Sequence, residues 1–195
     1  MLYMNYEDMV LFTDKKEEVF VNLDGTLQYS PTNYSFSGEF IDAEEVDDLH
    51  EVIAFFQTKY SVALALAKKA FRGKKDKAGK PYIHHLIAVS NSVSTYQEQI
   101  IGLLHDLLED TDYTYDYLLD NFGYLVANAV RRLTHKKDVD YMDYIKQIKT
   151  AAPYVRNVKI ADLCNNVDLG RLSEVTDEDR QRQKKYLKAL VYLLS

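Results

Sequence analysis

The sequence contains a single cysteine, Cys164, which excludes an internal disulfide and a metal site built from clustered cysteines. It has only 7 glycines and 3 prolines, a scarcity that favours a mostly helical chain with few tight turns. It also lacks any run of about 18 consecutive apolar residues, so no membrane span is predicted. The N-terminus has neither the basic region nor the apolar stretch of a signal peptide. We therefore expect a soluble, cytoplasmic protein.

The composition also limits the partners that this protein can have. A length of 195 residues suffices for one full-sized domain with a small addition, and a hydrophobic fraction of 47% supports a large core. The formal net charge of -6 provides no general attraction to nucleic acids or to anionic membranes. We expect neither of them as a partner.

Residues 1–48 differ in pattern from the rest of the chain. Two short stretches that favour strands, 19–23 and 26–29, flank an Asp-Gly pair, and this dipeptide is preferred in two-residue hairpin turns. Residues 30–38 are rich in turn-forming types and predict a loop. Because an isolated hairpin is only marginally stable, we expect a small β-hairpin extension that packs on the main body.

From residue 49 to residue 195, apolar residues recur at the three- and four-residue spacing of amphipathic helices. Glycines, prolines and capping residues divide this pattern into several helices. Gly123 is expected to close a short helix at its C-terminal end, because glycine readily adopts the left-handed conformation found there. The predicted fold is an all-α helical bundle over residues 49–195, with the small β-hairpin extension before it.

One predicted helix, residues 100–111, is apolar on nearly all sides, yet it carries His105, Asp106, Glu109 and Asp110. An apolar helix of this kind is normally buried, and buried carboxylates cost several kcal/mol unless they are paired or bound to a cation. On a continuous helix, His105 and Glu109 share one face, and Asp106 lies about 100° away from His105. This arrangement would present two ligands and a base to one metal ion. A solvated helix end is the alternative.

Two other apolar, helical segments contribute His85 and Asp162. Two imidazoles together with two carboxylates suit a divalent ion such as Mn²⁺, Fe²⁺ or Zn²⁺. Each residue also has a purely structural interpretation: His85 as a core histidine bonded to a carbonyl group, and Asp162 as the partner of Lys159 or Arg156 on its own helix. Spacing alone does not show that the segments meet. The candidate metal ligands are His85, His105, Asp106 and Asp162.

The order of these ligands resembles the H…HD…D signature of the HD-domain metal-dependent phosphohydrolases. Four stretches resemble, in order and spacing, the hydrolase domain of RelA/SpoT-type alarmone enzymes, and the likeness runs from about residue 60 to about residue 172. These stretches are 77–85, 103–111, 121–123 and 158–166. Nothing resembles the synthetase domain of the long bifunctional enzymes, so the likeness is to the short, stand-alone alarmone hydrolases.

The resemblance implies an HD-domain fold and one divalent ion, with Mn²⁺ the preferred choice, held by the four candidate ligands. It implies that Glu109 and Asp110 orient and deprotonate the attacking water. It further implies that Asn166 bonds ribose or phosphate and that Lys77 holds a pyrophosphate oxygen. The implied partner is a small nucleotide substrate, guanosine tetra- or pentaphosphate, from which pyrophosphate leaves the 3′ position.

Two positions depart from the family pattern. Asp76 stands where the family has an arginine that lies against the guanine base, and Leu163 stands where an arginine follows the last metal aspartate. These changes favour a different HD phosphohydrolase, acting on another nucleotide or on NADPH. The Glu109-Asp110 pair and Asn166 favour the alarmone substrate. A non-catalytic nucleotide-binding module is a third hypothesis, and the intact ligand set argues against it.

Two groups of basic residues remain. The loop over 72–80 is strongly basic, and only Lys77 within it is assigned to the substrate. A second basic group at Arg131, Arg132, Lys136 and Lys137 is interpreted as surface. The sequence does not specify an oligomeric state and leaves a homo-oligomer open.

Overall fold

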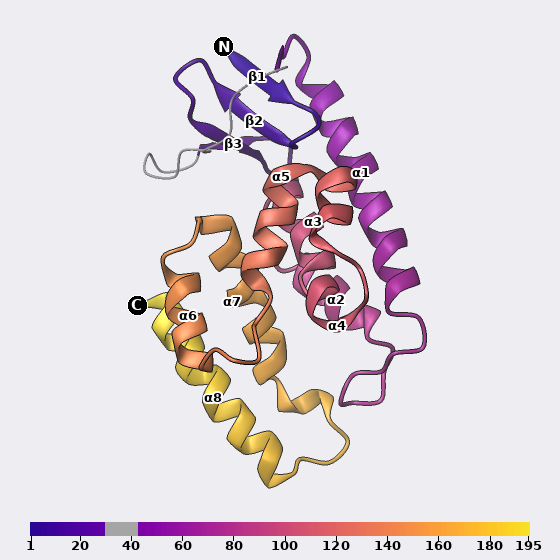
Figure 1. The fold of residues 1–195 in the computed structure, drawn as a ribbon, viewed down its shortest axis with the longest axis vertical. Helices are drawn as coiled ribbons and strands as arrows, with labels where there is room; N and C mark the ends of the chain where they lie inside the picture. The colour runs from indigo at the N-terminus through magenta and orange to yellow at the C-terminus, as the bar shows by residue number, and fades with distance from the viewer. Residues whose placement is uncertain (30–42) are drawn as a thin grey trace.

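The computed structural model describes residues 1–29 and 43–195, and the loop predicted over 30–38 lies outside the described residues. A small antiparallel sheet lies at one end of the molecule, against a larger bundle of helices (Figure 1). The predicted fold class, a helical bundle with a small β extension, is confirmed. No helix in the described part of the chain combines the length and the apolar character that crossing a bilayer requires.

The sheet is larger than the predicted hairpin, with the strand order β4-β3-β2-β1-β5. Its strands are β1 (Leu2–Asn5), β2 (Val10–Thr13), β3 (Glu18–Val21), β4 (Leu27–Tyr29) and β5 (Glu44–Glu45). The hairpin is present as β3 and β4, but the prediction of a two-residue turn is wrong. The Asn22 N–H donates to the carbonyl of Thr26, and Gly25 has a φ of 83° whereas Asp24 does not have a positive φ. A three-residue loop needs only this one left-handed residue.

The bundle is formed by helices of very different lengths. They are α1 (Leu49–Ala70), α2 (Ile83–Ser90), α3 (Tyr96–Leu104), α4 (Leu107–Asp110), α5 (Tyr115–Leu133), α6 (Tyr141–Lys149), α7 (Pro153–Val167) and α8 (Asp177–Leu194). One apolar core contains side chains of both the sheet and the helices, for example Met4, Leu11, Phe56 and Leu103. The extension therefore packs on the bundle, while a domain division at residue 48 stays a prediction.

The predicted single helix over 100–111 is wrong, because the helix is interrupted at His105 and Asp106. α3 ends at Leu104, α4 begins at Leu107, and Asp106 has φ -95° and ψ 3°. The apolar spacing continues across the break and gives no sign of it. Contacts from other helices hold the turn instead, as described for the metal centre below. His105 still has helical φ and ψ, so the turn at Asp106 changes the direction of the chain that carries Glu109 and Asp110.

Gly123 interrupts α5 with φ 70° and ψ 175°, a conformation that is essentially restricted to glycine. The helix was predicted to end here; it does leave helical geometry, but it resumes immediately. A Cβ atom at this position would lie 2.6 Å from the Cα of Asp8, in the turn between β1 and β2. The missing side chain therefore allows the sheet to touch the helix backbone.

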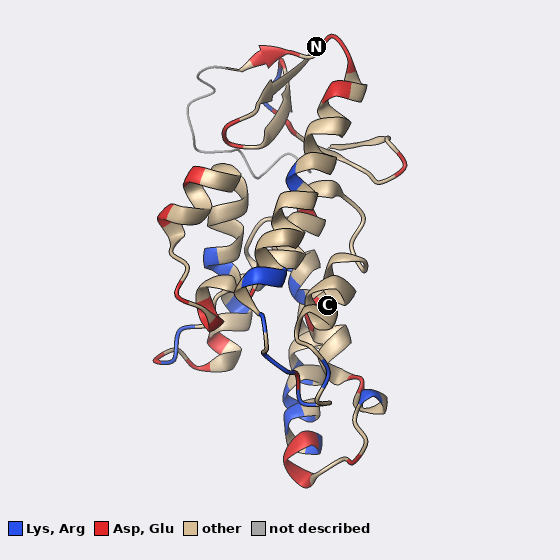
Figure 2. Cartoon of the chain, turned by 90° about the vertical axis from the view of Figure 1, so that its right-hand side faces the viewer, with Lys and Arg blue, Asp and Glu red and all other residues tan. Residues whose placement is uncertain are grey.

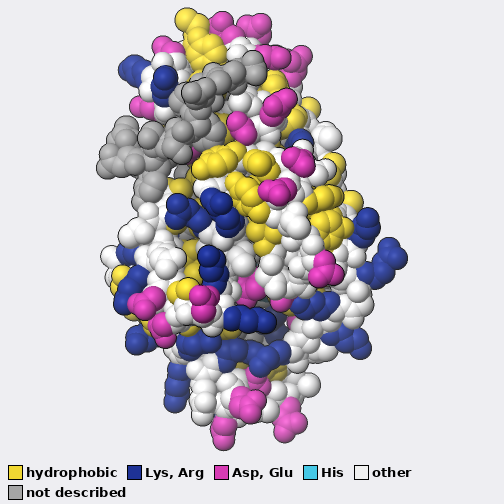
Figure 3. Space-filling model, in the orientation of Figure 1, with side chains coloured by type: hydrophobic (Ala, Val, Ile, Leu, Met, Phe, Trp, Pro, Cys, Tyr) yellow, Lys and Arg dark blue, Asp and Glu magenta, His cyan; other side chains and the backbone are white. Residues whose placement is uncertain are grey.

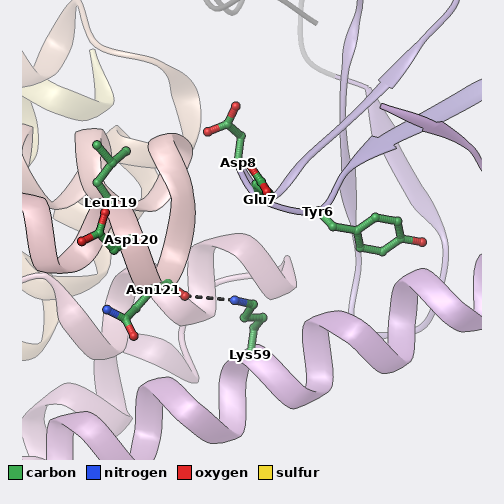
Figure 4. Close-up of a pocket in the computed structure, with 7 residues that line it drawn as sticks. All are labelled: Tyr6, Glu7, Asp8, Lys59, Leu119, Asp120 and Asn121. Atoms are coloured by element: carbon green, nitrogen blue, oxygen red, sulfur yellow. Dashed lines mark hydrogen bonds between the residues drawn. The ribbon is translucent and has the colours of Figure 1, made fainter. Parts of the chain in front are cut away.

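The two helix ends created at Gly123 receive their hydrogen bonds from other elements. Lys59 of α1 donates to the carbonyl of Asn121 over 2.9 Å, and the carboxylate of Asp8 accepts from the Tyr124 N–H over 3.3 Å. Figure 4 shows Lys59 reaching up to Asn121, with Asp8 on the turn that comes down from the sheet. Backbone groups that the interruption leaves without helical partners are satisfied in this way.

Candidate metal centre

The four predicted ligands come together from three separate parts of the bundle. His85 lies on α2, His105 and Asp106 lie between α3 and α4, and Asp162 lies on α7. Asp162 Oδ1 is 3.3 Å from the Nε2 atom of His85 and 3.7 Å from that of His105. Asp106 Oδ2 is 3.1 Å from the Nε2 atom of His105 and 3.7 Å from that of His85. The segments therefore meet, as a shared metal site requires.

Both histidine rings are fixed by their outer nitrogen atoms. His85 Nδ1 lies 2.7 Å from the side-chain oxygen of Asn165, and His105 Nδ1 lies 2.8 Å from the carbonyl oxygen of Gly102. Both partners accept hydrogen bonds, so each Nδ1 donates its proton outward and each Nε2 faces the centre, where it could bind a metal ion. Metal-binding histidines are commonly oriented by such outer hydrogen bonds.

A divalent ion fits this donor set. His105 Nε2 is buried and has no hydrogen-bond partner among the described residues, although buried nitrogen atoms are normally satisfied. Ligand atoms of a metal with bond lengths of about 2.1 Å lie about 3 Å apart, close to the separations found here. His85, His105 and Asp162 offer ligand atoms within 4.8 Å of one another, and Asp106 adds a second carboxylate.

Asp162 is placed both as a metal ligand and as the partner of Lys159, and it uses a different carboxylate oxygen for each. Its Oδ2 accepts from Lys159 Nζ over 2.8 Å, and its Oδ1 faces the two imidazoles and accepts from Asn166. Burial raises the pKa of this carboxyl, but Lys159 and the histidines outweigh it and hold the pKa well below its usual value. The same carboxylate keeps the pKa of the Lys159 ammonium high despite its burial. Asp162 is therefore ionised and correctly oriented before any ligand binds.

Tyr82 orients Asp106 and was not predicted from the sequence. Its hydroxyl donates to Asp106 Oδ2 over 2.6 Å. Burial raises the pKa of this tyrosine, and the nearby Asp106 raises it further, so the hydroxyl keeps its proton. Two signals in the sequence pointed to it: its position three residues before His85, on the same helical face, and its place within the family-like stretch 77–85.

The centre opens into a polar cavity of about 220 Å³. Its lining residues are Tyr82, His85, Asp106, Glu109, Asp110, His135, Tyr141, Lys159, Asp162, Asn166, Lys185 and Tyr186. Lys185 comes from α8 and lies 4.5 Å from the centre of the Tyr141 ring. Sequence reasoning missed Lys185 and His135, because no pattern indicated that α8 and the loop after α5 reach the centre.

Glu109 and Asp110, the predicted catalytic pair, both line this cavity but differ in their surroundings. The Oε2 atom of Glu109 accepts from the backbone N–H of His135 over 2.8 Å. Partial burial, with help from Asp106, raises the pKa of Glu109 despite this hydrogen bond. Asp110 instead forms a 2.8 Å ion pair with Lys74. Their catalytic roles stay predictions.

The two predicted substrate residues also differ. Asn166 lines the cavity and donates to Asp162. Lys77 does not line it: its Nζ lies 3.7 Å from Asp179 Oδ1, and 58% of its side chain is exposed. The loop that carries Lys77 follows α1 and is largely blue in Figure 2. Within this loop it is Lys74, bound to Asp110, that reaches the rim of the site.

Neither residue that departs from the family pattern lines the cavity. Asp76 accepts from the Lys80 N–H over 2.8 Å and lies 3.6 Å from a guanidinium nitrogen of Arg171, so it closes its own loop. Leu163 is 1% exposed and belongs to the apolar core. Neither of them is among the lining residues.

Comparisons with known proteins identify relatives of this chain. The guanosine-3′,5′-bis(diphosphate) 3′-pyrophosphohydrolase MESH1 of Danio rerio is 35% identical over 122 residues, which are 57% of this chain and 68% of that protein. A guanosine-3′,5′-bis(diphosphate) 3′-pyrophosphohydrolase of Aquifex aeolicus is 34% identical over 116 residues, which are 54% of this chain. That protein is much longer, and this chain spans only 17% of it.

A solved structure, reported as a metazoan orthologue of SpoT that hydrolyses ppGpp, superposes with a TM-score of 0.62 at 26% identity. The superposition covers 70% of this chain and 85% of the other. The sequence profile described as the HD domain matches residues 63–191, which is more than half of the chain. The protein therefore belongs to the HD domain family.

Proposed function

We propose that this protein is a metal-dependent hydrolase that removes pyrophosphate from the 3′ position of guanosine 3′,5′-bis(diphosphate), the activity for which several of its relatives are named. The observation that carries the proposal is the convergence of two imidazoles and two carboxylates beside Glu109 in one cavity. The cytoplasmic location and a homo-oligomeric state stay predictions.

His85, His105, Asp106 and Asp162 would hold one divalent ion. We propose Mn²⁺, with Fe²⁺ and Zn²⁺ as alternatives, because the donor set combines imidazole nitrogens with carboxylate oxygens. When bound, such an ion lowers the pKa of a coordinated water and polarises a phosphoryl oxygen.

Glu109 is the proposed general base. Its Oε2 is held by the His135 N–H, which leaves Oε1 to take a proton from water. The raised pKa of this carboxyl makes it a better proton acceptor than an ordinary glutamate. Asp110, fixed by Lys74, would orient the water.

We propose Lys185, rather than the predicted Lys77, as the contact for the pyrophosphate group, because Lys185 lines the cavity and Lys77 does not. Lys159 provides a second positive charge at the cavity wall. The alternative substrates, such as NADPH, were favoured by Asp76 and Leu163. Neither residue lines the cavity, and the alarmone remains the preferred substrate because several relatives are named for its hydrolysis.

The test is hydrolysis of guanosine tetraphosphate by the purified chain with Mn²⁺, with pyrophosphate and guanosine 5′-diphosphate separated by ion-exchange chromatography. Glu109→Gln should lower the rate by about 10² to 10⁴, the usual contribution of a general base. Asp110→Asn, the matched change at the next residue, should have a smaller effect. NADPH and GTP are assayed in parallel. The proposal is wrong if the wild-type chain releases no pyrophosphate with Mn²⁺, Fe²⁺ or Zn²⁺.

A further inference from the structure

A second cavity, of about 420 Å³, lies between the C-terminal end of α5 and helix α6. This volume is within the range of small-molecule sites, about 300 to 1,000 Å³. Its polar lining includes Arg131, Arg132, Lys136 and Gln147, and none of the described residues that line it is acidic. Figure 3 shows Lys and Arg side chains gathered on this face, over the C-terminal end of α5.

The three positive charges of this basic pocket are not neutralised within the described residues. No ion pair joins Arg131, Arg132 or Lys136 to a described carboxylate, whereas Lys146 on the neighbouring helix pairs with Asp143 at 2.7 Å. Arg131 is nevertheless held in place, since it donates to Asn128 Oδ1 over 2.7 Å and stacks on a tyrosine ring. Like charges in one cavity repel one another, and a bound anion would relieve that repulsion.

Stabilisation of a helix end accounts for only part of this arrangement. Arg131 and Arg132 lie in the last turn of α5, where cations interact favourably with the helix dipole. Lys136 lies beyond the helix end, and Gln147 belongs to α6, so the dipole does not explain why they face the same cavity. Buried apolar side chains such as Ile148 line the cavity beside them and strengthen electrostatic attraction to a ligand.

The basic pocket is separate from the metal centre, although the two share a wall. Their lining residues do not overlap. Thr134 and Lys136 line the basic pocket, whereas His135 between them lines the metal cavity and holds Glu109 through its N–H. A ligand in the basic pocket would therefore lie on the other side of the loop that positions the proposed base.

We propose that the basic pocket binds a small polyphosphate anion, either inorganic or the phosphate end of a nucleotide. Guanidinium groups bind phosphate oxygens through two parallel hydrogen bonds, and the Lys136 ammonium and the Gln147 amide add further donors. Linked phosphates match three cations grouped in one cavity better than a single monoanion does.

The experiment is calorimetric titration of the full chain in EDTA, so that no metal ion holds phosphate at the other site. Inorganic pyrophosphate and guanosine 5′-diphosphate are the two probes, and sulfate at the same ionic strength is the reference anion. Arg132→Glu combined with Lys136→Glu should weaken the binding of at least one probe by about tenfold or more. The matched control, Lys184→Glu with Lys188→Glu, makes the same charge change at exposed positions on α8 and should change affinity little.

Backbone amide NMR shifts locate the site, and with pyrophosphate they should move at residues 131–136 and at Gln147. If the glutamate variant does not fold, Arg132→Gln with Lys136→Gln provides the same test with a smaller loss. Equal weakening in the α8 control would overturn the proposal. Shifts confined to the metal cavity, or sulfate binding as tightly as both probes, would do so as well.

Discussion

Asp162 at the metal centre and Glu18 in the sheet are carboxylates buried to the same extent, since each residue is 5% exposed. Asp162 is surrounded by Lys159, Asn166 and two imidazoles, and its pKa is held well below the usual value. Glu18 has no hydrogen-bond or ion-pair partner among the described residues, and burial raises its pKa to about 7.

The two regions therefore use buried charge differently. At the centre, the charge of Asp162 faces Lys159 and two imidazoles, so that removing it leaves Lys159 uncompensated inside the protein. In the sheet, the charge of Glu18 is only a cost to stability, and its removal should be favourable. The same chemical change, from acid to amide, should consequently have opposite effects on stability in the two places.

The largest effect is expected for Asp162→Asn. The variant loses a metal ligand and leaves the buried Lys159 unpaired, so hydrolysis should fall by at least about 10³ and stability by about 3 kcal/mol. Urea unfolding with and without Mn²⁺ provides the check. Mn²⁺ at about 100 times its Kd should stabilise the wild-type chain by about 2.7 kcal/mol and the variant hardly at all. An equal gain in both proteins would show that Asp162 is not a ligand.

Gly123→Ala tests the junction that attaches the sheet to the bundle. The new Cβ would be forced into the turn at Asp8, at a backbone conformation that only glycine adopts easily, so we expect a loss of about 3 kcal/mol in urea unfolding. Gly73→Ala is the matched control: Gly73 has φ +79° with nothing within 4 Å of the added atom, so only the conformational cost remains, about 1 kcal/mol. Equal losses would mean that the close contact with the sheet contributes nothing.

Glu18→Gln should stabilise the protein, and the gain should depend on pH. The folded-state pKa of about 7 lies above the unfolded value near 4.5, so the folded state binds the proton more tightly. Wild-type stability therefore falls as pH rises from about 4.5 to about 7, by about 3 kcal/mol in total, and the amide removes this loss. Urea unfolding should show a small gain in stability for the variant at pH 5 and the full gain at pH 8. A gain that is the same at both pH values would contradict the assignment.

The sequence contained the parts of the site that depend on residue type and order. The two histidines and two aspartates were identifiable because their types suit one ion and their order resembles a known signature. The break at His105 and Asp106 was not predictable from periodicity, since the apolar spacing continues through it. The position of Lys185 against the centre depends on how α8 packs on α7, which no local pattern specifies.

The sheet shows the same limit. The Asp-Gly pair predicted the β3–β4 hairpin, because turn chemistry is local. Strands β1 and β2 are four residues each and carry no comparable signal; they become strands by pairing with each other and with β3. The sequence predicted a positive φ at Gly123. Glycine is needed there because Asp8, more than a hundred residues earlier in the chain, packs against its backbone.

The smallest effect is expected for Asp8→Ala, which removes the carboxylate that accepts from the Tyr124 N–H. Loss of a helix-capping side chain typically costs about 1 kcal/mol, and Asp8→Asn, which keeps an oxygen in place, should cost less than about half of that. Neither variant should change the rate of hydrolysis, because Asp8 lies at the sheet junction shown in Figure 4 and not in the metal cavity. Hydrolysis rates and urea unfolding of both variants distinguish a role in stability from a role in positioning the metal centre. A lower rate at unchanged stability would show that the sheet helps to position the centre through α5, and the separation between the two regions would then fail.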